Sequence, residues 1–340
     1  MLQRLIKEKS LYLLITTLLL NKLGEFYIHS FDKSATQDPL SLMSRSVVLS
    51  LLYFDIFSYP LTAKEVGFHS SSVDFSESVL NKELNDLESK NFIKSSQGYF
   101  FLAGRESTVE RRIAGNEKAN EYILKAQKIS KFISYFPFVK GIFISGSVAK
   151  GYADKDSDID YFIVTAPNRL WLSRTLLILF KKTILLNSKK YFCLNYFIDT
   201  EHLEIQDKNI FTAVELCYLL PTYNEVIADK MVQSNNWTKE YLPNYVQKDF
   251  PVIPENNSFI KKGIEKLFSG SIGNKLDDFC LSVTERFWKY KFRKTLGQNS
   301  IRCKKYVSKF HPQNFQDRVL DKYEEKISSY EQMYKTGLRA

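Results

Sequence analysis

Cysteine and histidine are scarce in this sequence, and their spacing argues against several classes of site. There are four cysteines and four histidines among 340 residues, and no two cysteines form a CxxC pair. Cysteines scattered in this way argue against a disulfide framework and against a zinc cluster. Histidines this far apart argue against a histidine-based metal site. The cysteine usage fits a reducing compartment, and we expect a cytoplasmic protein.

Long apolar runs are also missing. The one strongly apolar segment covers residues 11–20, and it is about half as long as a helix that crosses a bilayer. It follows Arg4, Lys7 and Lys9, as in a signal peptide, but no small-residue cleavage site is evident. We therefore expect no transmembrane segment. Residues 1–45 should form an N-terminal helix, packed on the body of the protein, and a polar linker.

Acidic residues are absent from Arg286 to Gln316, a stretch that carries nine basic residues. Residues 257–340 hold 18 Lys and Arg against 9 Asp and Glu, a difference of +9 out of a net charge of +10. Basic residues interleaved with aromatic ones suit a polyanion, so residues 286–310 are a candidate contact for a nucleotide, a nucleic acid or anionic lipid. The alternative is an amphipathic helix whose aromatic side chains belong to the core. The pattern favours neither interpretation.

Residues 46–104 predict a small module of three helices and a β-hairpin. Thr62, with Glu65 three residues later, forms a capping box for the second helix. A third helix is expected over residues 75–90, before the hairpin. This order is typical of a winged helix. The third helix holds four acidic residues and two lysines, so we expect docking or dimerisation rather than binding to duplex DNA.

Helices and strands alternate through residues 105–245. Strands are expected at 141–145, 161–165 and 191–199, and helices over 105–140, 167–186, 211–220 and 227–241. This alternation predicts an α/β (α+β) protein with a mixed sheet and flanking helices.

The most informative stretch is FISGSVAKGYADKDSDIDYFIV, residues 143–164, which predicts two strands around a polar loop. Asp158 and Asp160 are two residues apart on a strand, so their side chains point to the same face. Two carboxylates this close repel each other unless a cation binds between them. Mg²⁺ prefers such oxygen ligands together with phosphate oxygens. The pair therefore predicts a magnesium site.

The same stretch offers a phosphate-binding turn. Gly146 and Ser147 lie where the first strand turns into a helix, so backbone N–H groups and the Ser147 hydroxyl can hold a phosphate. Gly151 lets the loop turn back, and Ser157 can fix the start of the second strand through a local hydrogen bond. Along the chain, the stretch therefore predicts a phosphate-binding turn, then a loop, then a metal-binding strand.

The segment GSVAKGYADKDSDIDYF resembles the Gly-Ser and Asp-x-Asp motif of the DNA polymerase β-like nucleotidyltransferase superfamily, and most closely its small bacterial members. The likeness extends through the next helix and strand to residue 199. It implies transfer of a nucleoside monophosphate from an NTP to an acceptor hydroxyl, with Asp158 and Asp160 holding Mg²⁺.

The resemblance also implies the phosphate contacts. Gly146 and Ser147 would hold the β- and γ-phosphates. Arg169 and Arg174, early in the helix after the metal strand, would neutralise phosphate charge. The alternative is that these arginines are ordinary solvated helix positions, and the sequence supports both interpretations equally.

One position departs from the superfamily pattern. A third carboxylate is usual on the next strand, where it holds a second metal ion and helps to activate the acceptor. Here that strand reads YFCLNYFID, with Asn195 in its middle and Asp199 two pleats further on. An amide oxygen coordinates weakly and cannot act as a base. Either Asp199 reaches the metal, or acceptor activation differs, or catalysis is reduced or lost.

The sequence therefore predicts four regions: an N-terminal helix and linker (1–45), a winged-helix-like module (46–104), a nucleotidyltransferase-like core (105–245) and a basic helical region (246–340). The predicted function is Mg²⁺-dependent nucleotidyl transfer from an NTP to a small molecule, an RNA or a protein. The alternative is a catalytically weak or inactive nucleotide-binding regulator that acts through the winged-helix-like module.

Overall fold

The structure is a computed structural model that describes residues 40–72, 76–186, 190–256, 258–292, 301–310 and 314–338. The chain divides into two units, residues 1–41 and 42–340, and the description concerns the second. The predicted N-terminal helix and most of the predicted linker lie outside the described residues. Among the helices in the described ranges, none combines the length and the apolar character needed to cross a membrane.

Three helices and a small antiparallel sheet begin the second unit. The helices are α2 (Leu42–Asp55), α3 (Ala63–His69) and α4 (Glu77–Ser89), and the strands are β1 (Leu61–Thr62), β2 (Lys94–Ser96) and β3 (Tyr99–Phe101), in the order β1-β3-β2. The predicted capping box is present, because the Thr62 side chain accepts from the Glu65 N–H and the Glu65 carboxylate accepts from the Thr62 N–H. The assignment of this region as a winged helix stays a prediction.

A six-stranded mixed sheet forms the body of the unit. Its strands are β4 (Val139–Ser145), β5 (Asp160–Thr165), β6 (Cys193–Asp199), β7 (Leu220–Tyr223), β8 (Ile301–Lys304) and β9 (Val307–Phe310), in the order β7-β4-β5-β6-β9-β8. The β5–β6 pair is parallel and the other neighbouring pairs are antiparallel. The predicted mixed α/β class is confirmed.

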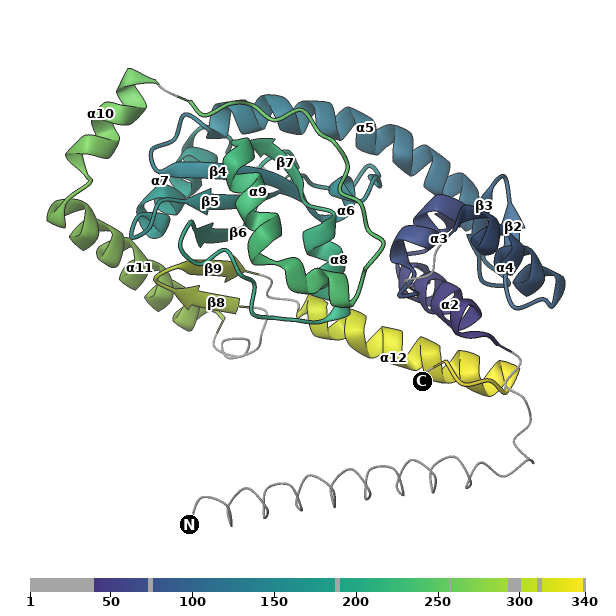
Figure 1. Cartoon of the computed structure of the whole chain (residues 1–340). Helices are drawn as coiled ribbons and strands as arrows, with labels where there is room; N and C mark the ends of the chain where they lie inside the picture. Colours follow the sequence, from purple (N-terminus) through teal and green to yellow (C-terminus); the bar gives the residue numbers. More distant parts are fainter. Residues whose placement is uncertain are drawn as a thin grey trace, which may run out of the picture. The chain divides into compact units, whose positions relative to one another are not determined.

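Helices cover both faces of this sheet (Figure 1). The helices from residue 105 onward are α5 (Thr108–Ile133), α6 (Gly146–Ala149), α7 (Leu170–Thr183), α8 (Ile210–Cys217), α9 (Glu225–Ser234), the 3₁₀ helix Asn236–Glu240, α10 (Phe259–Leu267), α11 (Ser271–Lys291) and α12 (Phe315–Tyr334). Side chains alternate along the strands, so Ile142 and Ile163 pack with α5, α7 and α11, whereas Phe143 and Phe162 pack with α9. The sheet therefore separates two layers of apolar core.

Two parts of the sheet differ from the sequence-based expectation. The C-terminal region was expected to be helical, which is wrong for β8 and β9, because this hairpin pairs with β6 and extends the main sheet. The expectation for residues 286–310 depended on their basic and aromatic side chains, and neither charge nor aromatic content determines secondary structure. The strand β7 was also not predicted. It contains Pro221, which a strand at the edge of a sheet tolerates.

Candidate active site

The turn between β4 and β5 places a glycine against a carboxylate. Ser145, the last residue of β4, lies opposite Asp160, the first residue of β5. Gly146 follows with a φ of +71°, a conformation that L side chains rarely adopt. A Cβ atom at this position would lie 2.5 Å from Asp160 Oδ2. Glycine is therefore required both by the backbone conformation and by the carboxylate that it faces.

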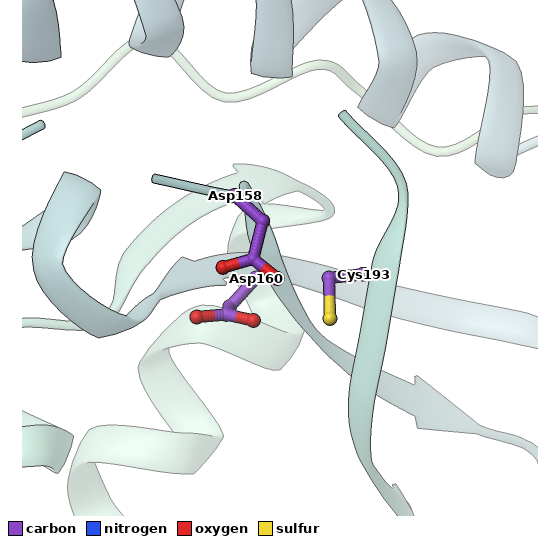
Figure 2. Close-up of side chains that lie close together, drawn as sticks. All are labelled: Asp158, Asp160 and Cys193. Carbon is purple, nitrogen blue, oxygen red and sulfur yellow. The ribbon is translucent and has the colours of Figure 1, made fainter. Parts of the chain in front are cut away.

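Asp158 and Asp160 lie on the same side of the chain, and Ile159 between them is buried in the core. Figure 2 shows the two carboxyl groups next to each other, with the Cys193 thiol of β6 beside them. One ligand atom from each of these three residues lies within 4.8 Å of the others. The alternation expected of a strand thus extends to Asp158, although β5 itself begins at Asp160.

The electrostatics of this pair suit a hard divalent cation. Burial, together with the charge of Asp158, raises the pKa of Asp160 to about 7. Burial and the charge of Asp158 disfavour the ionised form of Asp160, whereas a bound cation would favour it. Carboxylate oxygens are the ligands that Mg²⁺ prefers. Burial and the two neighbouring carboxylates raise the pKa of the Cys193 thiol. The sulfur therefore stays protonated at neutral pH and is a poor ligand for such an ion.

Asn195 reaches the carboxylates from β6 as a hydrogen-bond donor. The pairing of β5 with β6 shifts by one residue beside Asn195, which makes this residue the extra one of a bulge. Its Nδ2 donates to Asp160 Oδ1, and its Oδ1 accepts from Cys193 Sγ at 3.2 Å. The residue where the resemblance implied a third carboxylate therefore binds Asp160 directly and contributes no negative charge.

A cavity of about 740 Å³ lies beside the carboxylates. Two cationic side chains of α7 line it, Arg174 and Lys181. Arg174 has no ion-pair partner among the described residues, and its guanidinium lies 5.0 Å from the centroid of the Trp288 ring. Burial lowers the pKa of Arg174 to about 10, so the side chain stays charged at neutral pH. Much of the remaining lining is aromatic, including Phe54, Phe57, Phe162, Tyr196, Phe211 and Phe315.

The structure brings six of the predicted site residues to this cavity and leaves four outside its lining. Those that line it are Gly146, Ser147, Asp158, Asp160, Arg174 and Asn195. Gly151 and Ser157 shape the loop before β5 instead. Gly151 has a φ of +80°, and the Ser157 hydroxyl donates to Asp154 Oδ1 at 2.9 Å.

Arg169 lies away from the cavity, so the geometry does not support its predicted phosphate contact. Its buried guanidinium donates to the carbonyl oxygens of Phe268 at 2.7 Å and Ser269 at 2.6 Å, and to Asn274 Oδ1 at 2.6 Å. These bonds hold the turn between α10 and α11. Phe268 is 99 residues away from Arg169 in the chain, so no local sequence pattern predicts this contact.

Asp199 also lies away from the carboxylate pair, and its predicted metal contact is wrong. It lies opposite Thr165 at the end of β5, whereas Asp160 lies opposite Cys193 at the start. The length of the strand puts these positions roughly 20 Å apart. The Asp199 carboxylate is instead hydrogen-bonded to His202 Nδ1 at 2.7 Å and accepts from the Glu201 N–H at 3.0 Å.

The cavity lining also contains an ion pair that the sequence does not predict. Lys150, just after α6, has its Nζ 2.6 Å from Glu215 Oε1 of α8, and both residues line the cavity. The Tyr59 hydroxyl, from the N-terminal part, donates to the Lys150 carbonyl at 2.7 Å. Glu215 and Tyr59 are far from the motif in sequence, so only the fold could identify them.

The raised pKa of Asp160 predicts a pH-dependent difference between the parent and Asp160→Asn. With a folded pKa of about 7 against an ordinary value of 3.8, the folded protein binds more protons than the unfolded chain between these values. The free energy of unfolding therefore falls as the pH rises from about 4 to about 7. Asp160→Asn removes this pH-dependent fall in the free energy of unfolding. In thermal unfolding with EDTA, we expect the variant's advantage in Tm to be about 2–5 °C larger at pH 8 than at pH 5.

The exposed Asp156→Asn, in the same loop, controls for the lost negative charge and should show no such trend. An advantage of equal size at both pH values would contradict the raised pKa. Mg²⁺ should raise the Tm of the parent at pH 8 and leave that of Asp160→Asn almost unchanged.

Residues 125–224 match the family model of the nucleotidyltransferase domain. The match includes the Gly146 turn, both carboxylates and the strand that carries Asn195, and it implies transferase activity with an NTP as substrate. It does not extend to residues 42–101, so the winged-helix assignment is not confirmed. No curated protein and no solved structure matches the chain. The carboxylate pair and the turn that faces it thus lie in the part of the chain that matches the nucleotidyltransferase domain model.

Proposed function

We propose that this domain transfers a nucleoside monophosphate from an NTP to an acceptor hydroxyl and that it requires Mg²⁺. The strongest support is the position of Asp158 and Asp160, which face the Gly146 turn and line the cavity. No protein cation forms an ion pair with either carboxylate among the described residues. A half-buried acidic pair without such a partner suits a metal ion better than a purely structural role.

The proposed reaction is a substitution at the α-phosphorus. The acceptor oxygen forms a bond to this phosphorus, the bond to the bridging oxygen breaks, and pyrophosphate leaves. Bound Mg²⁺ would neutralise the charge on the phosphate oxygens, and Asp158 and Asp160 would hold it. Arg174 and Lys181, which line the same cavity from α7, would offset the phosphate charge. Gly146 and Ser147 would contact the β- and γ-phosphates.

Glu215 is the proposed acceptor of the hydroxyl proton. Asn195 cannot take a proton, because it is an amide. Asp207 also lines the cavity, but Arg302 and Lys309 both form ion pairs with it. Among the described residues, Glu215 has a single cationic partner, Lys150.

The cavity lining favours a small acceptor with an apolar body over a polycation. Apart from the metal pair, the acidic residues in the lining are Asp207 and Glu215, and both are neutralised by protein cations. Aromatic side chains make up much of the rest. A polycationic acceptor would therefore find little negative charge, whereas an apolar molecule with one hydroxyl would find complementary walls.

Incubation with each labelled NTP, Mg²⁺ and fractions of a cell lysate tests the proposal. Label transferred to a small molecule, together with release of pyrophosphate, is the expected result. Transfer to RNA or protein would keep the reaction but contradict the proposed acceptor. NTP binding without transfer to any fraction would contradict the reaction itself.

A second candidate function is a nucleotide-binding regulator with little or no catalysis. The observation that favours it is Asn195, an amide that binds Asp160 where the resemblance implied a third carboxylate. In this function the nucleotide would bind and change how residues 46–104 contact a partner.

Replacing Asn195 by aspartate distinguishes the two candidates. If a third ligand is simply missing, Asn195→Asp adds a hard anionic oxygen beside Asp160 and should raise the affinity for Mg²⁺ by about tenfold or more. Turnover should rise, or appear where none is measurable. Without metal, the third carboxylate should lower the free energy of unfolding by about 1–3 kcal/mol, and Mg²⁺ should restore it.

Metal titration and melting temperature are measured on the same protein. Asn120→Asp, at an exposed position of α5, adds the same charge away from the cavity and should change neither. If Asn195→Asp has a lower melting temperature that Mg²⁺ does not restore, and no gain in Mg²⁺ affinity, then the site does not simply lack a third carboxylate ligand.

A further inference from the structure

The polar side of α10 faces the protein. Lys261 is buried, and its Nζ donates to the carbonyl oxygens of Ser134 at 2.9 Å and Val139 at 2.8 Å. One turn later, Glu265 accepts from the Phe138 N–H at 2.6 Å. This helix is therefore fixed to the body by polar contacts, which is the reverse of the usual arrangement for a surface helix.

The apolar side of α10 faces solvent instead. Phe259 is 93% exposed, Ile260 76% and Leu267 68%. At 100° per residue these three side chains fall within about 100° of the helix circumference. They form an apolar stripe on the side away from Lys261.

The next helix repeats this arrangement. Ile272, Phe279, Val283 and Tyr290 of α11 are 68%, 64%, 49% and 83% exposed, and their spacing of 7, 4 and 7 residues puts them on one side of the helix. Trp288 lies on the other side, buried against the body. Figure 1 shows α10 and α11 joined by a short turn at one end of the described unit.

Positive charge surrounds these two stripes. Lys262 and Lys266 of α10, and Lys275 and Arg286 of α11, are exposed and have no ion-pair partner among the described residues. The acidic residues of the two helices are Glu265, Asp277, Asp278 and Glu285, and each forms an ion pair with a lysine. The uncompensated charge on this surface is therefore positive.

We propose that the outer surface of α10 and α11 lies on a membrane that contains anionic lipids. The apolar stripes would enter the boundary between headgroups and acyl chains, while the lysines would extend to the lipid phosphates. A second copy of the chain would bring two basic surfaces together, which disfavours a homodimer here. Nucleic acid would satisfy the charge but leave Ile260, Leu267 and Val283 without an apolar partner.

Flotation of the full-length chain with vesicles tests this proposal. We expect binding to vesicles of phosphatidylcholine mixed with phosphatidylglycerol, and much weaker binding to phosphatidylcholine alone. The double substitution Ile260→Ser with Phe279→Ser should lower the partition coefficient by about tenfold or more. Its matched control is Leu124→Ser with Val226→Ser, two side chains that are 63% and 62% exposed on other helices, and this control should bind like the parent.

A second pair of variants tests the charge. Lys262→Gln with Lys266→Gln should lower binding to the anionic vesicles by about tenfold, whereas Lys82→Gln with Lys128→Gln, both exposed elsewhere, should not. Equal flotation of the α10–α11 variants and the parent would assign binding to another segment and overturn the proposal. Two other results would also overturn the proposal. In the first, light scattering shows self-association of the parent that these substitutions abolish, while vesicle binding persists. In the second, the parent binds nucleic acid and the same substitutions abolish that binding, while vesicle binding persists.

Discussion

Asp158→Asn and Asp160→Asn should each lower nucleotidyl transfer by about a thousandfold or more, equivalent to about 4 kcal/mol of transition-state stabilisation. Each substitution replaces an anionic oxygen by a neutral amide at the position proposed to hold Mg²⁺. Isothermal titration should show that Mg²⁺-dependent binding of the NTP is lost in parallel. The two carboxyl groups lie close together, so both are proposed to hold the same ion, and the loss of either one removes a ligand of that ion.

The folded structure should survive both substitutions. Asparagine at position 160 can still accept from Asn195 Nδ2 through its amide oxygen, and it removes a carboxylate whose ionisation is disfavoured by burial. Circular dichroism and melting temperature should therefore match or exceed the parent at neutral pH. Asp156→Asn, exposed and two residues before Asp158, should retain full transfer. Full activity in both Asp158→Asn and Asp160→Asn would show that the metal assignment is wrong.

The centre of the fold could be predicted from the sequence because its signals are local. Continuous apolar runs flank the loop in β4 and β5, and the alternation of side chains along a strand places Asp158 and Asp160 together. Helical spacing and the Thr62 capping box likewise predicted the N-terminal helices. In these segments a few neighbouring residues determine the local conformation, so the helices and strands can be recognised from the sequence alone.

The parts that were missed depend on contacts between distant segments. Nothing within β9 indicates that it pairs with β6, and nothing near Arg169 indicates that its partners lie in the turn between α10 and α11. The distance between Asp199 and the metal pair follows from the parallel register of β5 and β6, which a linear motif does not contain. The same holds for Glu215, whose helix brings it to Lys150.

The structure adds a reason for the glycine of the motif that the sequence did not provide. From the sequence, Gly146 is expected in a turn whose backbone N–H groups can hold a phosphate. The geometry shows that it also lets Asp160 approach, because Asp160 Oδ2 occupies the space where a Cβ atom would be. The turn and the carboxylate therefore form one unit, and a change in either should disturb the other.

Gly146→Ala should lower transfer by about a hundredfold or more, since a displacement of about 1 Å at a reacting centre has an effect of this size. The new Cβ would lie 2.5 Å from Asp160 Oδ2, so the carboxylate or the turn must move. Alanine at a φ of +71° also costs about 1–2 kcal/mol in backbone strain. Transfer rate, Mg²⁺ affinity and free energy of unfolding are measured on the same protein.

Gly98→Ala is the matched control, because Gly98 has a φ of +79° and, apart from its chain neighbours, no described residue has an atom within 4 Å of the position of a Cβ. It should have a similar backbone strain and a similar loss of free energy of unfolding, but it should keep full transfer and full Mg²⁺ affinity. The difference between the two variants then isolates the contact with Asp160 from the strain of the turn. If Gly146→Ala kept both its transfer rate and its metal affinity, the carboxylate would tolerate displacement, and the close approach of Gly146 would not be part of the site.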